Sequence, residues 1–316
     1  MSQRDNILGS EIQRYQSKGF GAAIACAIIA AFVVFWKPSA EMWWVWAQRV
    51  MQERDWNIQF FYLVFGHGVT LAGINIVCNV TCAILYWGNW PIVERYKVLE
   101  EPWPWQSDPE AFKKQLGKTF WLYLLNMYVL GPLVYGIFYM TGDDLAVDYS
   151  PKGVPSTPKM LAQLIICMMM EDFTFHCSHR FLHLKQIYPY VHKIHHEYNV
   201  TISISAQHAH PLEFVLGNML PTAIGPLLLG KKMHISTLFT WYALRHFESI
   251  DGHTGYEFSF SPFRMLPMAS DYGYHVYHHS HNIGNFSSFF TFWDTVFGSN
   301  KAYFEYLEEK EASLRA

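Results

Sequence analysis

The chain has 316 residues, of which 51% are hydrophobic and 17% aromatic, whereas charged residues make up only 16%. Soluble domains carry about a quarter charged residues, so this composition favours a membrane protein. A formal net charge of −3 offers no basic surface, which argues against a protein that binds nucleic acid.

Long uncharged stretches predict the first membrane-spanning helices. No Asp, Glu, Lys or Arg lies between Lys18 and Lys37, and residues 19–36 are long enough to cross a bilayer. Because no signal-peptide cleavage pattern follows, we interpret this stretch as a retained span. Residues 60–87 predict one tilted span, with a bent hairpin as the alternative, and residues 119–140 predict the next span.

The residues between the first two spans mix aromatic and charged side chains. Four tryptophans lie among charged residues here: Trp43, Trp44, Trp46 and Trp56. Tryptophan concentrates at membrane–water interfaces, so this Trp-rich segment is predicted to lie at the surface of the bilayer.

Three further apolar stretches occur in the second half of the chain. Residues 160–170 are apolar and lead directly into Glu171, Asp172 and a histidine-rich region. Residues 214–230 and 235–247 are both short, and two prolines are expected to bend the first of them. We interpret this pair as a hairpin that enters the membrane and returns.

The distribution of positive charge predicts the orientation of these spans. Counting crossings places residues 90–118 and the histidine-rich region on one side, which carries Arg95, Lys97, Lys113, Lys114, Lys118, Arg180, Lys185 and Lys193. The opposite loop, residues 141–159, has two lysines against three aspartates. The positive-inside rule therefore predicts that the histidines face the cytoplasm, or the matrix of an organelle.

Histidines are the most informative residues of this chain. It contains 16, and all but His67 fall between His176 and His281. Eight of them form three short clusters: His179 and His183; His192, His195 and His196; His275, His278 and His279. Because residues three and four apart share one face of a helix, each cluster directs its imidazoles to one side.

Two more histidines occupy suggestive positions, His210 in AQHAHPLE and His253 in ESIDGHTGYEF. Together with the clusters they make ten candidate metal ligands, which are too many for one ion and fit two. Sites rich in nitrogen and lacking cysteine suit Fe, Zn, Cu or Ni. Since neutral ligands with vacant positions favour O2 chemistry, we predict two iron ions, with zinc possible in the isolated protein.

Carboxylates are expected beside such a cluster, because neutral imidazoles leave the charge of the metals uncompensated. Glu171 and Asp172, at the end of an apolar stretch, are the leading candidates for a catalytic role. The other candidates are Glu197, Glu213, Glu248, Asp251 and Asp271.

The pattern of motifs resembles the fatty acid hydroxylase/sterol desaturase superfamily and, within it, the C4-methyl sterol oxidases. The resemblance extends from about Phe60 to Tyr306. It is carried by E-D-x4-H-x2-HR-x-LH (171–183), Y-x2-HK-x-HHEY (188–198), AHPLE (209–213), E-x-ID-x-H-x-GY (248–256), H-x2-HH with I-GN (275–285) and WD-x2-FG (293–298).

This resemblance implies an all-α protein: a multi-span helical membrane domain capped by a helical histidine-box domain with a di-iron centre. It further implies that the protein uses O2 to oxidise a C–H bond of a sterol-like lipid, with electrons from cytochrome b5 or a reductase. All ten candidate ligands match family positions. Residues 1–56 are an N-terminal addition with an extra span, 57–306 form the family domain, and 307–316 form a charged tail.

The chain departs from the sterol oxidases at a few positions of these motifs. Phe175 stands where they commonly have a histidine, and His176 beside it is a possible substitute. The sterol oxidases typically have the motif A-E-Y-A-H-P, in which this chain has Gln207 and His208. Val276 replaces an acid of the third histidine box.

These lost acids, with the extra span and the Trp-rich segment, leave a second hypothesis open. In it, the chain is an accessory structural subunit of a larger membrane complex that keeps the fold and the metals without turnover. We expect the endoplasmic reticulum for an enzyme, with the histidine boxes facing the cytosol, and the mitochondrial inner membrane is the alternative.

Overall fold

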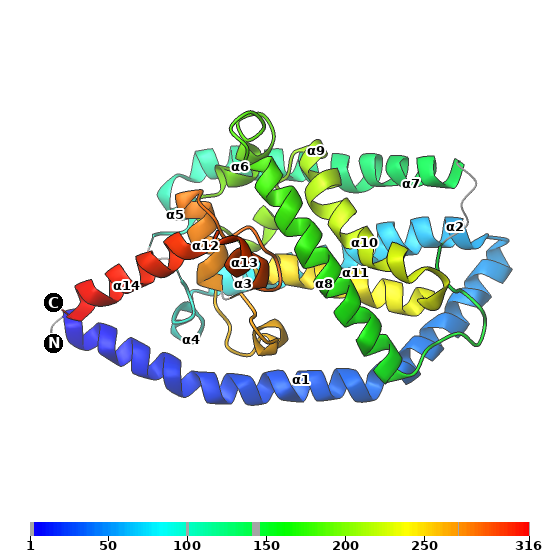
Figure 1. The fold of residues 1–316 in the computed structure, drawn as a ribbon, viewed down its shortest axis with the longest axis horizontal. Coiled ribbons are helices and arrows are strands. Elements are labelled where there is room, and N and C mark those ends of the chain that lie inside the picture. Colours follow the sequence, from blue (N-terminus) through cyan, green and yellow to red (C-terminus); the bar gives the residue numbers. More distant parts are fainter. Residues whose placement is uncertain (1–2, 99–100, 141–145, 271, 316) are drawn as a thin grey trace.

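The computed structural model describes residues 3–98, 101–140, 146–270 and 272–315. These residues are mostly helical; they form no β-sheet, only isolated bridges such as that between Lys97 and Tyr256. The all-α prediction is therefore confirmed (Figure 1).

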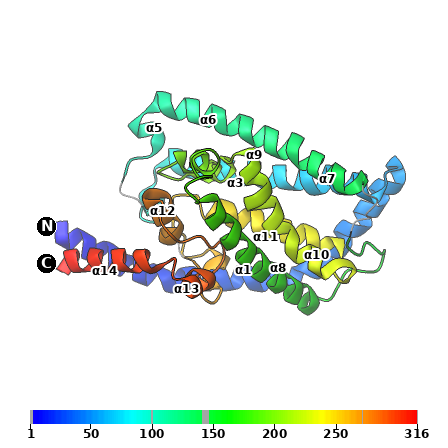
Figure 2. The same cartoon turned by 45° about the horizontal axis from the view of Figure 1, so that its top comes forward.

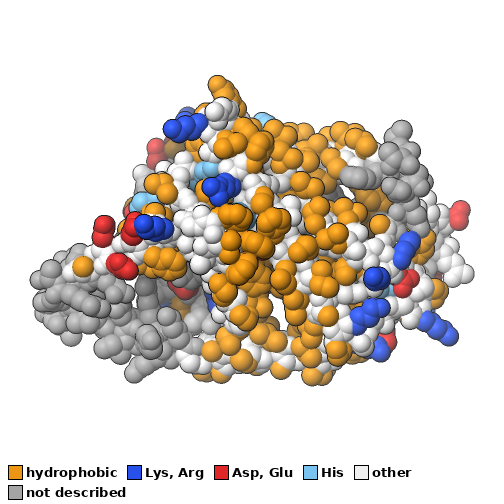
Figure 3. All heavy atoms as spheres, viewed as in Figure 1, with side chains coloured by type: hydrophobic (Ala, Val, Ile, Leu, Met, Phe, Trp, Pro, Cys, Tyr) orange, Lys and Arg blue, Asp and Glu red, His pale blue; other side chains and the backbone are white. Residues whose placement is uncertain are grey.

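The described residues contain five helices that are long and apolar enough to cross a membrane: Gly19–Arg54, Ile58–Gly88, Pro109–Ile137, Thr157–Leu182 and Pro211–Lys232. Each predicted span except 235–247 falls within one of them or, for residues 119–140, overlaps it up to Ile137. The chain is thus a multi-pass membrane protein. In Figure 3, hydrophobic side chains cover the broad middle of the visible face, and charged side chains gather toward its two ends.

The long helices are built from consecutive helical elements. They are α1 (Gln3–Arg54); α2 (Ile58–Phe61), η1 (Tyr62–Thr70) and α3 (Leu71–Gly88); α6 (Pro109–Leu124), η2 (Leu125–Leu130) and α7 (Gly131–Met140); α8 (Thr157–Leu182); and α9 (Pro211–Glu213), η5 (Phe214–Met219) and α10 (Leu220–Leu229). Residues 58–88 therefore form one uninterrupted helical run, which confirms a single span rather than a bent hairpin.

Shorter elements complete the chain. They are α4 (Pro91–Glu94), α5 (Pro104–Ser107), η3 (His192–Glu197), η4 (Ser203–Gln207), η6 (Gly230–Lys232), α11 (Ile235–Asp251), η7 (Pro262–Met265), α12 (Tyr272–His281), α13 (Phe292–Phe297) and α14 (Lys301–Arg315). Helices α10 and α11 follow each other through η6 and pack together, and only the first lies in a helix long and apolar enough to cross the membrane.

The Trp-rich segment belongs to α1, which continues through Pro38 as one helix. Trp44 is only 2% exposed, and its Nε1 donates to the carbonyl of Ser150 at 3.1 Å. Trp43 lies against Phe239 of α11, with ring centroids 4.8 Å apart. Part of this segment is therefore interior, because the neighbouring helices offer its rings a larger apolar surface than the interface does.

The histidine-bearing elements lie together at one end of the molecule. Helix α8 runs from the right half of Figure 1 toward α12 and α13 in the left half. The beginning of α1 and the end of α14 lie beside each other at this same end, as both views show (Figures 1 and 2). The long helices thus form a platform, and the sequence after α11 folds over one end of it.

The close approach of α8 and α10 yields a stability prediction. A Cβ atom on Gly225 would lie 2.7 Å from the Cα atom of Cys167, so Gly225→Ala must push the two helices apart. We expect a loss of about 1–3 kcal/mol, seen as a lower unfolding temperature in detergent. Gly136→Ala is the matched control, since its Cβ meets nothing within 4 Å. Equal unfolding temperatures for both variants would contradict this packing.

Candidate metal centre

The structure assembles nine histidines into two groups. In each group, one ring nitrogen of every member lies within 4.8 Å of those of all the others. The first group is His179, His183, His192, His196 and His278, and the second is His195, His253, His275 and His279. These residues come from α8, η3, α12 and the turn after α11, which are far apart in the sequence.

Neighbouring histidines of one cluster belong to different groups. His195 and His196 are adjacent in η3, yet their ring planes stand at 87° and the rings enter the second and the first group. His278 and His279 in α12 diverge in the same way, at 88°. Each of these two elements therefore contributes to both groups and holds them side by side.

Hydrogen bonds to backbone carbonyls fix the tautomers of several rings. The Nδ1 atom of His278 lies 2.6 Å from the carbonyl oxygen of Gly284, and that of His253 lies 2.7 Å from the carbonyl oxygen of Ser249. His179 and His195 bond in the same way to Phe286 at 2.9 Å and to His208 at 3.3 Å. Because a carbonyl can only accept, each Nδ1 carries the proton and each Nε2 presents a lone pair.

Nε2 atoms within the two groups face one another at hydrogen-bond distances, and the tautomers fixed by the carbonyls leave at least one such pair without a proton between its two atoms. Those of His195 and His253 are 3.3 Å apart, although both tautomers place the proton on Nδ1. Similar Nε2–Nε2 distances separate His179 from His192 (3.0 Å), His183 from His278 (3.2 Å) and His253 from His275 (3.0 Å). Converging lone pairs repel each other unless a cation lies between them, so both groups fit a metal ion.

The electrostatics of the buried site keep these rings neutral. Burial, reinforced by the neighbouring imidazoles, lowers the pKa of His183 to about 2 and that of His195 to about 3. Burial also lowers the pKa of His253 to about 4 and moves the pKa of His275 well below its usual value. An imidazole must be unprotonated to bind metal, so the site is ready for a cation at neutral pH.

Comparison with known proteins agrees with this geometry. A family model described as fatty acid hydroxylase matches residues 164–299. Methylsterol monooxygenase 1 of Gallus gallus is 33% identical over 71% of this chain and 73% of its own length. The Rattus norvegicus protein of the same name is 33% identical over 69% and 71%.

The chain belongs to the fatty acid hydroxylase/sterol desaturase superfamily. A very-long-chain aldehyde decarbonylase, GL1-8 of Oryza sativa subsp. indica, is 38% identical over 50% of this chain and 60% of its own length. No solved structure matches the present chain.

One of the ten predicted ligands lies outside both groups. His210 caps the N-terminus of α9, where its Nδ1 accepts from the backbone N–H of Leu212 at 3.1 Å. Pro211 begins the helix, so this ring satisfies a free backbone donor instead of joining the other imidazoles. The sequence suggested this residue as a ligand from its position in AQHAHPLE, and the local helix start gives it another partner.

The two possible substitute ligands also lie outside the groups. His176 is buried beside Asp294, with Nδ1 3.3 Å from a carboxylate oxygen. His208 lies between the hydroxyl of Thr119 at 2.8 Å and the carboxylate of Glu197 at 2.9 Å. Both rings thus have other partners.

Two residues that depart from the superfamily pattern, Phe175 and Val276, pack against their neighbours. The ring of Phe175 lies under the guanidinium of Arg245, 5.4 Å from its carbon, and Val276 is only 3% exposed.

The predicted catalytic carboxylates hold the walls of the site. Glu171 pairs with Arg245, which also bonds Glu248 at 2.8 Å. Asp172 accepts from three consecutive backbone N–H groups, those of Ser288, Phe289 and Phe290, at 2.8–3.1 Å. Neither carboxylate belongs to the two groups of ligands. Asp271 lies outside the described residues.

Glu213 is the carboxylate that touches a ligand ring. It is 4% exposed, and one of its oxygens lies 2.9 Å from Nδ1 of His192. This contact places a buried carboxylate against the ring of a candidate ligand. Glu213 was among the candidate carboxylates in the sequence.

Asp294 is a functional residue that the search for ligands missed. It accepts from the backbone N–H groups of Phe286 and Ser287, both at 2.9 Å, and from the hydroxyl of Tyr274 at 2.9 Å. The carbonyl of Phe286 is the acceptor that holds His179, so Asp294 positions a ligand through one peptide unit. Its position in the WD-x2-FG motif was the sequence signal that could have identified Asp294.

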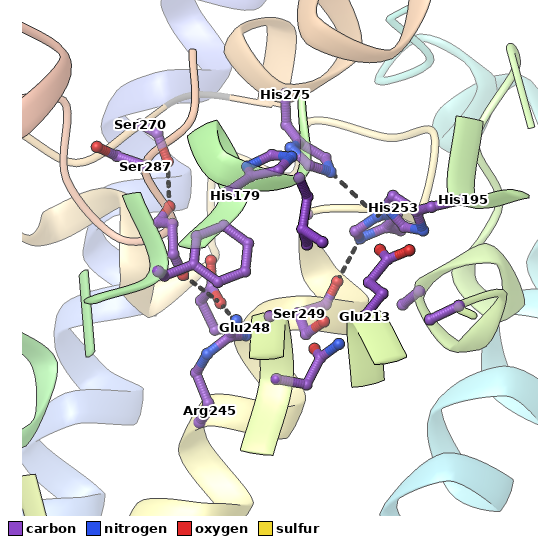
Figure 4. Close-up of a pocket in the computed structure, with 18 of the residues that line it drawn as sticks. His179, His195, Glu213, Arg245, Glu248, Ser249, His253, Ser270, His275 and Ser287 are labelled. Carbon is purple, nitrogen blue, oxygen red and sulfur yellow. Dashed lines mark hydrogen bonds and ion pairs between the residues drawn. The ribbon is translucent and has the colours of Figure 1, made fainter. Parts of the chain in front are cut away.

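A large cavity lies among the membrane-spanning helices, next to the histidine pocket. It measures about 780 Å3, and its wall is mostly apolar, with side chains of α7, η5, α10 and α11 among its lining. A small pocket of about 60 Å3 at its inner end is lined by His179, His195, His253 and His275 (Figure 4). The two spaces share wall residues, among them Arg245 and Ser249, so the cavity adjoins the histidine pocket.

The lowered pKa values predict how pH affects the metal-free protein. Between about pH 4 and 6.5 the folded imidazoles remain neutral, while the same groups in the unfolded chain bind protons. Stability should therefore fall as pH decreases from 7.5 to 5.5, measured as the unfolding temperature in detergent after chelation. A metal-free protein that is equally stable or more stable at pH 5.5 would show that these rings are not held neutral.

The two groups also predict metal stoichiometry. Protein purified without oxygen should hold two metal ions per chain, and His275→Ala should reduce this to one, because the second group has four members. His210→Ala is the matched control and should keep both ions. Elemental analysis measures the outcome, and equal metal loss in the two variants would contradict the assignment.

Proposed function

We propose that this chain is a di-iron oxidase that uses O2 to oxidise a C–H bond of a sterol-like lipid taken from the membrane. The observation that carries this is the convergence of imidazole lone pairs at the inner end of an apolar cavity. Iron suits the nine neutral nitrogen donors, which include no thiolate, and zinc is the alternative in the isolated protein. Bound iron would supply the redox chemistry that activates O2.

The protein aligns the imidazoles, shields the small pocket from water and offers a cavity for the lipid. Backbone carbonyls and Glu213 keep the imidazoles aligned before metal or lipid arrives. Phe175 and Leu182 line the small pocket and limit the access of water to it. The cavity lets a lipid enter with most of its apolar surface still covered.

The relatives favour an oxidoreductase over an accessory subunit. Methylsterol monooxygenases of Gallus gallus, Rattus norvegicus and Danio rerio match most of the chain at 32–33% identity. The chain also keeps an apolar cavity beside the histidine pocket, which a purely structural subunit does not need. A membrane oxidase of sterol-like lipids therefore accounts for more of the chain than the structural alternative.

The proposal extends to the electron donor of the protein and to the membrane in which it lies. Exposed cations, Arg180, Lys185 and Lys193, lie in the sequence beside ligands of the first group. Such a surface fits an acidic electron donor, and cytochrome b5 or a reductase is the proposed partner. We place the protein in the endoplasmic reticulum with the histidines facing the cytosol; the mitochondrial inner membrane is the alternative.

Turnover of a defined lipid tests this function. The purified protein, loaded with Fe(II) without oxygen and then given O2, a chemical reductant and a 4-methyl sterol, should yield a product heavier by one oxygen. Oxygen labelled as 18O2 should appear in that product. His275→Ala, which lacks a ligand of the second group, should lose activity at least a hundredfold.

Two results would contradict the proposal. One is an iron-loaded protein that oxidises neither sterols nor other long-chain lipids. The other is native mass spectrometry of a gentle detergent extract that finds the chain only as a stoichiometric subunit of a large complex.

A further inference from the structure

Tyr86 lies outside both groups of histidines, yet its hydroxyl joins two segments that serve members of the second group. The residue belongs to the last turn of α3 and is 8% exposed. Its hydroxyl donates to the carbonyl of Thr254 at 2.6 Å and accepts from the backbone N–H of Ser203 at 3.0 Å. A phenolic hydroxyl can donate and accept at once, so a single oxygen atom connects the two segments.

One side of this connection leads to His253. Thr254 follows His253 directly, in the turn after α11. The carbonyl of Ser249, in the last turns of α11, orients the ring of His253 through its Nδ1 at 2.7 Å. The bond from Tyr86 acts one residue beyond the ligand, so it holds the backbone of the turn from which this ring projects.

The other side of the connection leads to His195. Ser203 begins η4, and His208 directly follows the end of η4. The N–H of His208 donates to the carbonyl of Ser205 at 3.0 Å, so η4 and His208 form one hydrogen-bonded unit. The carbonyl of His208 in turn accepts from Nδ1 of His195 at 3.3 Å. A displacement of Ser203 therefore moves the acceptor that orients this ring.

Packing fixes the ring of Tyr86. It stacks on Tyr256, with centroids 5.6 Å apart and planes at 19°, and its centroid lies 4.9 Å from that of Trp103. A Cβ atom on Gly255 would lie 2.6 Å from the indole of Trp103, and φ at Gly255 is +81°, so glycine lets the indole close over this turn. The hydroxyl of Tyr86 is therefore held in one position by its neighbours.

A short segment between α4 and α5 ties the same turn from its other side. The N–H of Val98 donates to the carbonyl of Gly255 at 3.1 Å, and the N–H of Glu257 donates to the carbonyl of Tyr96 at 2.8 Å. These two bonds flank the isolated bridge between Lys97 and Tyr256. The turn that follows His253 is thus gripped between this segment and the end of a membrane-spanning helix.

The first group of histidines has supports in another part of the chain. The carbonyl of Phe286 accepts from His179. The carbonyl of Gly284 accepts from His278. Both carbonyls lie in the loop after α12, whereas the two backbone groups bonded to Tyr86 lie at residues 203 and 254. Loss of the Tyr86 hydroxyl should therefore disturb the second group and spare the first.

We propose that Tyr86 is a positioning residue of the second metal site, where its hydroxyl holds the segments of His195 and His253 together and so sets the affinity of this site for its ion. This inference rests on the proposed function, because it concerns the metal centre that the function requires. The Nε2 atoms of the two rings are 3.3 Å apart, a separation at which both can bind one ion. A small shift of either segment changes that separation directly.

Metal titration of the full-length protein tests the role of Tyr86. The metal-free chain in detergent, kept without oxygen, is titrated with Fe(II) against a competing chelator, which gives an affinity for each ion. Tyr86→Phe keeps the stacked ring and loses the hydroxyl. It should weaken the binding of one ion about 10–100-fold, the usual effect of removing a group behind a metal ligand, and leave the other ion unchanged.

Tyr256→Phe is the matched control. Its hydroxyl lies in the same aromatic cluster and donates to Glu94 at 2.6 Å, so this variant also loses one hydrogen bond but keeps the connection between Thr254 and Ser203. It should bind both ions with the affinities of the wild type.

Two ligand variants assign the weakened ion to one of the groups. In His275→Ala, which lacks a member of the second group, adding Tyr86→Phe should leave the affinity of the remaining ion unchanged. In His183→Ala, which lacks a member of the first group, the same addition should still weaken one ion about 10–100-fold. A general loss of stability would instead lower the affinity for iron in both backgrounds.

The outcomes separate this inference from the function on which it rests. A chain that binds two Fe(II) ions, and keeps both affinities in Tyr86→Phe, overturns the role of Tyr86 and leaves the metal centre standing. Equal weakening of both ions, or the same loss in Tyr256→Phe, also overturns that role. A wild type that binds no Fe(II) overturns both this inference and the proposed function.

Discussion

Repulsion between imidazole lone pairs is the constraint on which the rest of this structure depends. Nine neutral rings point their Nε2 atoms into two small volumes, an arrangement that is unfavourable without positive charge between them. Each ring is held there from behind by a carbonyl, a carboxylate or close packing. A cation bound within each group would remove this repulsion and stabilise the folded chain, so metal binding and folding are coupled.

The supports of these rings form a second layer as specific as the ligands. Asp172 and Asp294 accept from consecutive backbone N–H groups of residues 286–290, the segment whose Phe286 carbonyl orients His179. Glu171 fixes Arg245, which separates the histidines from the apolar cavity. The acids that the sequence suggested for chemistry thus act largely through the backbone and through Arg245, as is common for residues that surround metal sites.

The sequence predicted the helical class, most of the spans and the nine histidines that the structure brings together, because each depends on local spacing. Residues four apart share a helix face, so His179 and His183 had to point together. The division into two groups could not be predicted, since adjacent rings such as His195 and His196 diverge according to the tertiary path of η3. His210 lies outside both groups for a related reason. Pro211 starts a helix, and the ring of His210 accepts from the backbone N–H of Leu212 in its first turn. The burial of Trp44 likewise depends on partners distant in the chain.

The order of the ligands along the chain has a consequence for biogenesis. The last helix long and apolar enough to cross the bilayer ends at Lys232, whereas four of the nine ligands, at positions 253–279, come after it. During synthesis, neither group can close until this final stretch has left the ribosome and folded back over helices already embedded in lipid. The proposed loading with metal is therefore a late step, separated in time from insertion, and a chain interrupted after Lys232 would lack four of the nine histidines needed to complete the two groups.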